Sequence, residues 1–132
     1  MIKVLIPLNS EFKLYEKELK TLYEVCQDKI CDPNSFDFIV NETLFYCFVE
    51  DKSIIGVIYF FKEGEKLYLN AFGRRGNFKE KIECLITSLG WFNCDIYAEA
   101  QNRASALCLL RAGFKRVKDK LFVYNNTLHQ NI

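Results

Sequence analysis

Several features that would narrow the function of this chain are missing from its sequence. Its 132 residues carry 18 Lys and Arg against 17 Asp and Glu, which gives a formal net charge of +1. A dedicated binder of duplex nucleic acid normally has a clear basic excess, so the balance of charge argues against that class. The longest apolar run, Ile54–Phe61, has eight residues including a glycine, whereas roughly 20 are needed to cross a bilayer.

The N-terminal segment Met1–Leu8 contains neither the apolar stretch nor the cleavage pattern of a secretory signal. A cytoplasmic protein without a membrane partner is therefore the expectation.

Histidine and closely spaced cysteine pairs are also scarce. His129 is the only histidine, and no two of the six cysteines form a Cys-x-x-Cys pair. A structural zinc site needs such spacings, so no metal is expected. Without an export signal the cysteines are predicted to be reduced thiols. The four that lie in apolar patterns, and are expected in the core, are Cys47, Cys84, Cys94 and Cys108.

What the chain does contain is apolar and aromatic side chains in quantity. Half of the residues are hydrophobic, with 12 Phe and 7 Tyr, which excludes intrinsic disorder. A chain of this length buries roughly two-thirds of its unfolded surface without disulfides or metal. Residues 1–132 are therefore predicted to form a single domain.

Hydrophobic periodicity and turn residues predict the order of the elements. The strands are expected at Met1–Pro7, Leu44–Glu50, Ile54–Phe61, Lys66–Phe72, Asp95–Ala100, Phe114–Val117 and Leu121–Tyr124. The helices are expected from Phe12 to Cys26, from Phe78 to Leu89 and from Asn102 to Ala112. Between the first helix and the second strand, Gln27–Asn41 is predicted to be a loop with a short helical turn at Phe36–Val40, and the tail Asn125–Ile132 is predicted to fray.

This order defines the predicted fold class, an α/β (α+β) domain with a mixed, mostly antiparallel sheet flanked by helices. The strand–helix–strand unit from Lys66 to Ala100 implies that its two strands pair in parallel through a right-handed crossover.

The connection Gly73-Arg74-Arg75-Gly76-Asn77-Phe78-Lys79 lies between the first of these strands and its helix. Two glycines, three cations and a helix N-terminus suit a phosphate or pyrophosphate. The segment is neither a P-loop nor a Rossmann fingerprint. A solvated turn with basic side chains explains it equally well.

The segment Asn102-Arg-Ala-Ser-Ala-Leu-Cys-Leu-Leu-Arg-Ala-Gly113-Phe114 is more specific. Asn102 is placed to cap a helix, Gly113 to reverse the chain and Phe114 to return to the core. In type and spacing Asn102, Ser105, Gly113 and Phe114 resemble the late signature of the GNAT superfamily of N-acetyltransferases. The predicted element order is similar to that of this family over nearly the whole chain.

The resemblance implies that acetyl-coenzyme A lies where the two parallel strands in the middle of the sheet splay apart. Its pyrophosphate would sit on a loop of pattern Gln/Arg-x-x-Gly-x-Gly/Ala, with Arg74 at the first position. This chain departs from that pattern, because Asn77 and Lys79 stand where glycines are expected. The residues that the resemblance assigns to the cofactor are Leu69, Ala71, Arg74, Arg75, Gly76, Asn77, Phe78, Lys79, Asn102 and Ser105.

The catalytic machinery of the family is incomplete here. Leu109 stands seven residues after Asn102, where many members carry a tyrosine that protonates the leaving thiolate. Candidates for acid and base roles are Tyr68, Tyr97 and Glu99, for which packing or solvation is the simpler explanation.

Three functions stay open at this point. The first is an acetyltransferase that uses acetyl-CoA to acetylate a primary amine, on a small molecule or a peptide, by direct attack. The second is a catalytically weak or inactive coenzyme A-binding or protein-interaction module, for which a homodimer is an expected partner. The third, a nucleic-acid binder, rests on six cations against one anion between Ala100 and Lys120, which a solvated face also explains.

Overall fold

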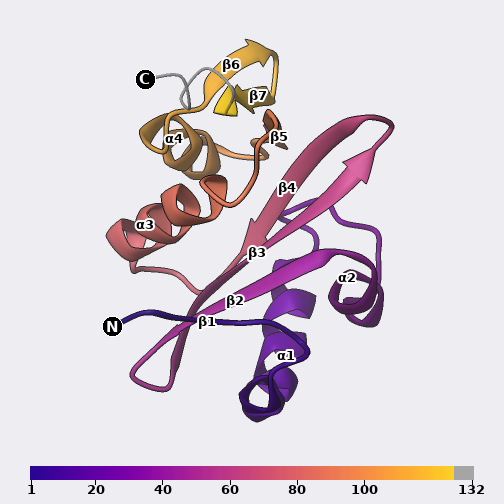
Figure 1. Ribbon diagram of the computed structural model, residues 1–132, viewed down its shortest axis with the longest axis vertical. Helices are drawn as coiled ribbons and strands as arrows, with labels where there is room; N and C mark the ends of the chain where they lie inside the picture. Colours follow the sequence, from indigo (N-terminus) through magenta and orange to yellow (C-terminus); the bar gives the residue numbers. More distant parts are fainter. Residues whose placement is uncertain (127–132) are drawn as a thin grey trace. The chain divides into compact units, whose positions relative to one another are not determined.

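The structure is a computed structural model that describes residues 1–126. Its strands are β1 (Lys3–Leu5), β2 (Leu44–Glu50), β3 (Ser53–Glu63), β4 (Lys66–Phe72), β5 (Ile96–Glu99), β6 (Lys115–Lys118) and β7 (Leu121–Tyr124). Its helices are the 3-10 helix η1 (Ser10–Leu14) and the α-helices α1 (Glu16–Cys26), α2 (Phe36–Glu42), α3 (Phe78–Leu89) and α4 (Arg103–Arg111). The strands form one sheet in the order β1-β2-β3-β4-β5-β7-β6 (Figure 1).

The predicted fold class is confirmed. The β1–β2, β2–β3, β5–β7 and β6–β7 pairs are antiparallel, and β4 and β5 run parallel. Helix α3 connects β4 to β5, as a parallel pair requires. Within residues 1–126 no helix is both long and apolar enough to cross a membrane.

The chain divides into two compact units. Unit 1 comprises Met1–Phe60 and Ala71–Asn77, and unit 2 comprises Phe61–Asn70 and the residues from Phe78 onward. The prediction of a single domain over residues 1–132 remains a prediction.

Unit 1 is built on aromatic side chains. Phe45, Tyr59 and Phe72 are nearly inaccessible to solvent, and their ring centroids lie 6.3–6.4 Å apart. Tyr23 of α1 adds a ring edge-on to Phe72 at 5.3 Å. Such pairs stabilise a core beyond the area that they bury, and they hold α1 against the end of β4 within unit 1.

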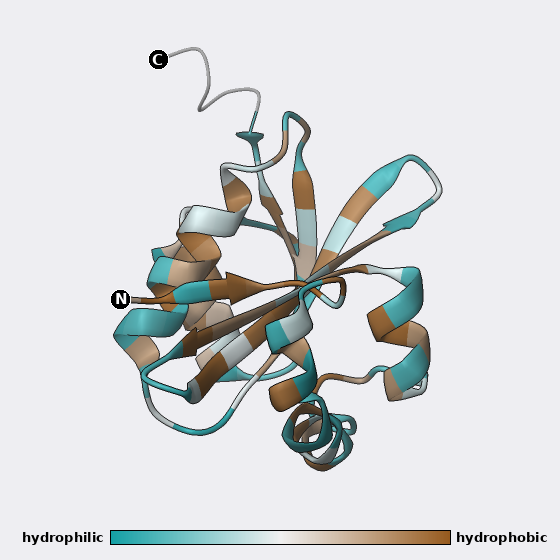
Figure 2. Ribbon diagram, turned by 60° about the horizontal axis from the view of Figure 1, so that its bottom comes forward, coloured by the Kyte–Doolittle hydropathy of each residue, from teal (hydrophilic) through white to brown (hydrophobic). Residues whose placement is uncertain are grey.

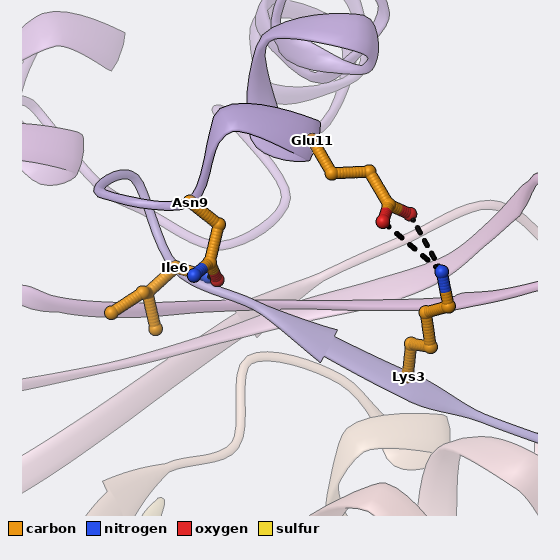
Figure 3. A network of polar contacts seen from close by, with 4 residues as sticks. All are labelled: Lys3, Ile6, Asn9 and Glu11. Carbon is orange, nitrogen blue, oxygen red and sulfur yellow. Dashed lines mark hydrogen bonds and ion pairs between the residues drawn. The ribbon is translucent and has the colours of Figure 1, made fainter.

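The first helical segment differs from its prediction. The stripe that begins at Phe12 was expected to form one helix, but the chain forms η1 and then starts α1 after Tyr15. Figure 3 shows how η1 is attached to β1, because Lys3 Nζ lies 3.0 Å from both Glu11 carboxylate oxygens and the Ile6 N–H donates to Asn9 Oδ1. Asn9 therefore fixes the turn before η1 and does not cap α1.

The predicted short turn at Phe36–Val40 is a two-turn helix. Ser35 Oγ accepts a hydrogen bond from the Phe38 N–H at 3.1 Å, which is an N-cap. Phe36, Ile39 and Val40 are buried, and their spacing of three and four places them on one face.

In unit 2, helices α3 and α4 pack against each other, and α4 also packs on β6. Figure 2 shows that both helices mix hydrophilic and hydrophobic residues along their turns, as amphipathic helices do. Leu85 and Leu89 of α3 and Leu109 of α4 are buried.

Two sequence predictions about single residues are wrong. Cys94 is exposed and Cys108 half-buried, whereas Cys47 and Cys84 are buried as expected; Cys94 lies in the turn before β5, where its apolar neighbours do not enclose it. All six thiols are free, as predicted.

The start of the tail is also ordered. Asn126 is 3% exposed, and its Nδ2 donates to Leu89 O at 2.8 Å and to Phe92 O at 2.5 Å. The prediction that Asn125 and Asn126 fray is therefore wrong. A local pattern could not show this, because Leu89 and Phe92 lie far from Asn126 in the sequence. Residues 127–132 lie outside the described residues.

Candidate active site

The parallel pair of unit 2 is short. Its register joins Leu67 to Ile96, Tyr68 to Tyr97 and Leu69 to Ala98. β4 continues to Phe72. On its other side β5 pairs with β7, from Ile96 with Tyr124 to Glu99 with Leu121. Of the two β4 residues that the resemblance assigns to the cofactor, Leu69 is buried and Ala71 is exposed.

Helix α4 begins as the sequence predicts. Asn102 is its N-cap, and Asn102 Oδ1 accepts a hydrogen bond from the Ser105 N–H at 2.8 Å. Asn102 therefore positions Ser105 through the backbone. Because the cap uses the carbonyl oxygen of the side chain, a role in ligand binding falls to the Nδ2 group, which carries two donors.

The C-terminus of α4 forms a Schellman motif. The Gly113 N–H donates to Leu110 O at 3.1 Å, and the Phe114 N–H donates to Leu109 O at 3.0 Å. Gly113 has φ of +105°, and Phe114 is 3% exposed. The reversal at Gly113 and the return of Phe114 to the core are thus confirmed.

The loop Gly73–Asn77 belongs to unit 1. Gly76 and Asn77 have φ of +91° and +52°, both in the left-handed region. Asn is one of the few residues with a side chain that adopts this region readily. The backbone at Asn77 therefore has the conformation that glycine usually supplies, although the family's glycine is absent. Arg75, Gly76 and Asn77 are exposed to solvent.

The Arg74 side chain contacts helix α1. Its Nη2 forms an ion pair with Glu18 Oε2, and the two side chains are 48% and 46% exposed. The Cys26 thiol, on the same helix, donates to Gly73 O at 3.6 Å. Two side chains of α1 thus contact two successive residues of the loop. The Arg74–Glu18 contact was not predictable from a local pattern, because it joins residues 56 positions apart.

In unit 2, the first turn of α3 contains Phe78 and Lys79. Phe78 is 36% exposed, and the Arg111 guanidinium carbon lies 5.3 Å from its ring centroid. This distance is typical of a cation–π contact. Phe78, which the resemblance assigned to the cofactor, is therefore packed against α4. Lys79 is exposed.

The catalytic candidates contact one another or solvent. The rings of Tyr68 and Tyr97 lie 5.6 Å apart, and Lys66 Nζ lies 4.9 Å from the Tyr97 centroid. Glu99 is exposed at the end of β5. Leu109 is 5% exposed, so the position at which the family places its acid belongs to the core here. None of these contacts assigns an acid or a base.

A polar network that the sequence did not predict orders the loop after α1 in unit 1. Asp32 Oδ2 accepts from Tyr59 Oη at 2.5 Å, and Asp32 Oδ1 accepts from the backbone and side-chain amides of Asn34. Gln27 Nε2 donates to the backbone carbonyls of Asp32 and Asn34. Tyr23 Oη also donates to the backbone carbonyl of Asn34. Burial, and then the negative charge of Asp32, raise the pKa of Tyr23. The sequence predicted this segment only as part of the loop Gln27–Asn41.

Across residues 1–126 no group of three or more His, Cys, Asp or Glu side chains is arranged to hold a metal ion.

Comparisons with known proteins give little further information. No family model matches the sequence. No curated protein matches it either. Among solved structures, a crystal structure of AtaTR bound with AcCoA aligns over 99% of this chain and 96% of that chain, with a TM-score of 0.48 and 11% identity.

Proposed function

We propose that this chain is an acetyl-CoA-dependent N-acetyltransferase that acetylates a primary amine. The observation that carries the proposal is the parallel pairing of β4 with β5, from Leu67 with Ile96 to Leu69 with Ala98, on a β4 strand that runs to Phe72. The pantetheine arm of acetyl-CoA would form hydrogen bonds with the backbone N–H and C=O groups of a strand, so the identity of the side chains on that strand matters little.

The conformation of the loop and of α4 supports the same proposal. The loop has glycine-like backbone at Gly76 and Asn77, and Arg75 and Lys79 are exposed cations. Backbone amides in such a turn, with the Arg75 cation in the same loop, suit the pyrophosphate of coenzyme A. Asn102 presents its Nδ2 donors at the N-terminus of α4, where the resemblance places a ligand contact.

Acetyl-CoA supplies a thioester, which is an activated acyl group with a good leaving group. The neutral amine nitrogen attacks its carbonyl carbon, the C–S bond breaks, and the proton lost by the amine balances the one gained by the thiolate. In this chain Leu109 supplies no acid. The rate would then depend on positioning and on polarisation of the carbonyl.

Ligand-induced stabilisation tests the proposal. A saturating ligand at 100 times its Kd stabilises a protein by about 2.7 kcal/mol, which raises the Tm of a domain of this size by several degrees. We expect such a shift with acetyl-CoA, and its loss in the double variant Asn102→Ala and Arg74→Ala. No shift at millimolar acetyl-CoA would contradict the proposal.

A matched control is available within the chain. Ser35→Ala removes a helix cap as Asn102→Ala does, and Lys3→Ala removes a cation from an exposed ion pair as Arg74→Ala does. This control double variant should keep the full shift with acetyl-CoA.

The buried Leu109 favours one alternative, a coenzyme A-binding module without turnover. The two functions are distinguished by incubating the protein with acetyl-CoA and a panel of primary amines, and by measuring the free thiol of coenzyme A that is released. Turnover supports the transferase, whereas binding without turnover supports the module.

A further inference from the structure

Helix α1 contacts the loop Gly73–Asn77 at two points. The Cys26 thiol contacts Gly73 near the C-terminal end of α1, and Glu18 pairs with Arg74 eight residues earlier on the helix. At 1.5 Å per residue these two positions are about 12 Å apart along the axis. The Arg74 side chain therefore extends back along α1, and its guanidinium is held on the helix.

We infer that Glu18 is an internal competitor for the anion that binds this loop. The inference rests on the proposed function and adds regulation of the same site by α1. In the ligand-free protein the Glu18 carboxylate occupies part of the Arg74 guanidinium, and coenzyme A must displace or share that contact to use Arg74.

The geometry and the charges determine whether Glu18 strengthens or weakens the binding of an anion to the loop. A guanidinium binds a carboxylate or a phosphate through the same planar N–H groups, and the Glu18 contact engages Nη2. Removal of the Glu18 charge should therefore strengthen anion binding.

The size of the effect is limited by solvent. Both side chains are about half exposed, and exposed ion pairs typically change an equilibrium by about 1.5- to 5-fold. We expect the Kd of coenzyme A to fall about threefold in Glu18→Gln, which keeps the size and a polar oxygen of the side chain.

The experiment measures Kd by calorimetry at low ionic strength for two probes, coenzyme A and inorganic pyrophosphate. The variants are Glu18→Gln, Arg74→Gln and the double variant, with Glu11→Gln as the control. Glu11 is also a glutamate paired with a cation, Lys3, within unit 1 (Figure 3), and its side chain is 36% exposed. Its removal changes the net charge equally and should leave both Kd values within experimental error.

The double variant isolates the competition. Glu18→Gln should tighten both probes, Arg74→Gln should weaken both, and Glu18→Gln should give no gain when Arg74 is already replaced. An unchanged or weaker affinity in Glu18→Gln overturns the inference, as does an equal gain in the Arg74→Gln background.

The outcomes also separate this inference from the proposed function. Coenzyme A binding that depends on Arg74 but not on Glu18 overturns the inference and leaves the transferase intact. Pyrophosphate binding that Glu18→Gln tightens, without any coenzyme A binding, supports the competition and contradicts the transferase. No binding of either probe contradicts both.

Discussion

At the scale of the residue, Gly113 has the clearest structural requirement. Its φ is +105°, and a Cβ there would lie 3.1 Å from Tyr124 Cε1. The left-handed region alone costs a residue with a side chain about 1–2 kcal/mol. We expect Gly113→Ala to lower the free energy of unfolding by about 2 kcal/mol, measured by urea denaturation.

Gly90 is the matched control, because it follows α3 as Gly113 follows α4. Its φ is not in the left-handed region, and a Cβ there would make only an ordinary contact of 3.5 Å. Gly90→Ala should change stability by less than about 0.5 kcal/mol. Equal effects at the two positions would show that the Schellman geometry does not decide stability here.

Single residues were predictable where local chemistry decides their conformation. Asn102 as a cap, Gly113 as a helix stop and Asn77 in unusual backbone all follow from side chains acting on the nearest few residues. Cys94 was misplaced because burial depends on neighbours from elsewhere in the chain. The ion pair of Arg74 was missed for the same reason.

At the scale of the element, capping and ligand binding by Asn102 can be separated. Asp caps helices about as well as Asn, and its charge favours a helix N-terminus. Asn102→Asp should therefore leave the free energy of unfolding within about 0.5 kcal/mol, whereas Asn102→Ala should lower it by about 1 kcal/mol.

Binding should respond differently from stability. Asp has no amide donor and adds a negative charge, so Asn102→Asp should weaken acetyl-CoA binding by tenfold or more if Nδ2 contacts the ligand, since two donors are lost. Calorimetric titration measures this. Unchanged affinity in Asn102→Asp would mean that Asn102 caps α4 and does not contact acetyl-CoA.

Elements with a strong period were predicted well, and irregular ones were not. β2 and β4 have the predicted bounds, since their aromatic and aliphatic runs end at clear turns. The break between η1 and α1 at Tyr15 and the full length of α2 depend on tertiary packing and on the Ser35 cap. The apolar pattern alone does not specify either.

At the scale of the whole molecule, long-range contacts limited what the sequence could predict. The parallel β4–β5 pair followed from element order and crossover rules. The network around Asp32 links α1, the following loop and β3, and the contacts of α1 with Gly73 and Arg74 cross about 50 residues. No pattern within one segment contains such information.

The two units share strands, which bears on whether the chain unfolds as one domain. β3 and β4 each contribute residues to both units, so the loss of either unit removes part of a strand of the other. We therefore expect one cooperative transition for the whole chain.

Thiol labelling across a urea series measures this with a probe in each unit. Cys47 in unit 1 and Cys84 in unit 2 are 0% and 5% exposed, and burial raises the pKa of Cys47 to about 12, which leaves almost no reactive thiolate in the folded state. Both should become reactive at the same urea midpoint, whereas the exposed Cys31 and Cys94 should react without denaturant. Separate midpoints for Cys47 and Cys84 would mean that the chain folds as two domains. In that case the strands shared by the two units would not couple their unfolding.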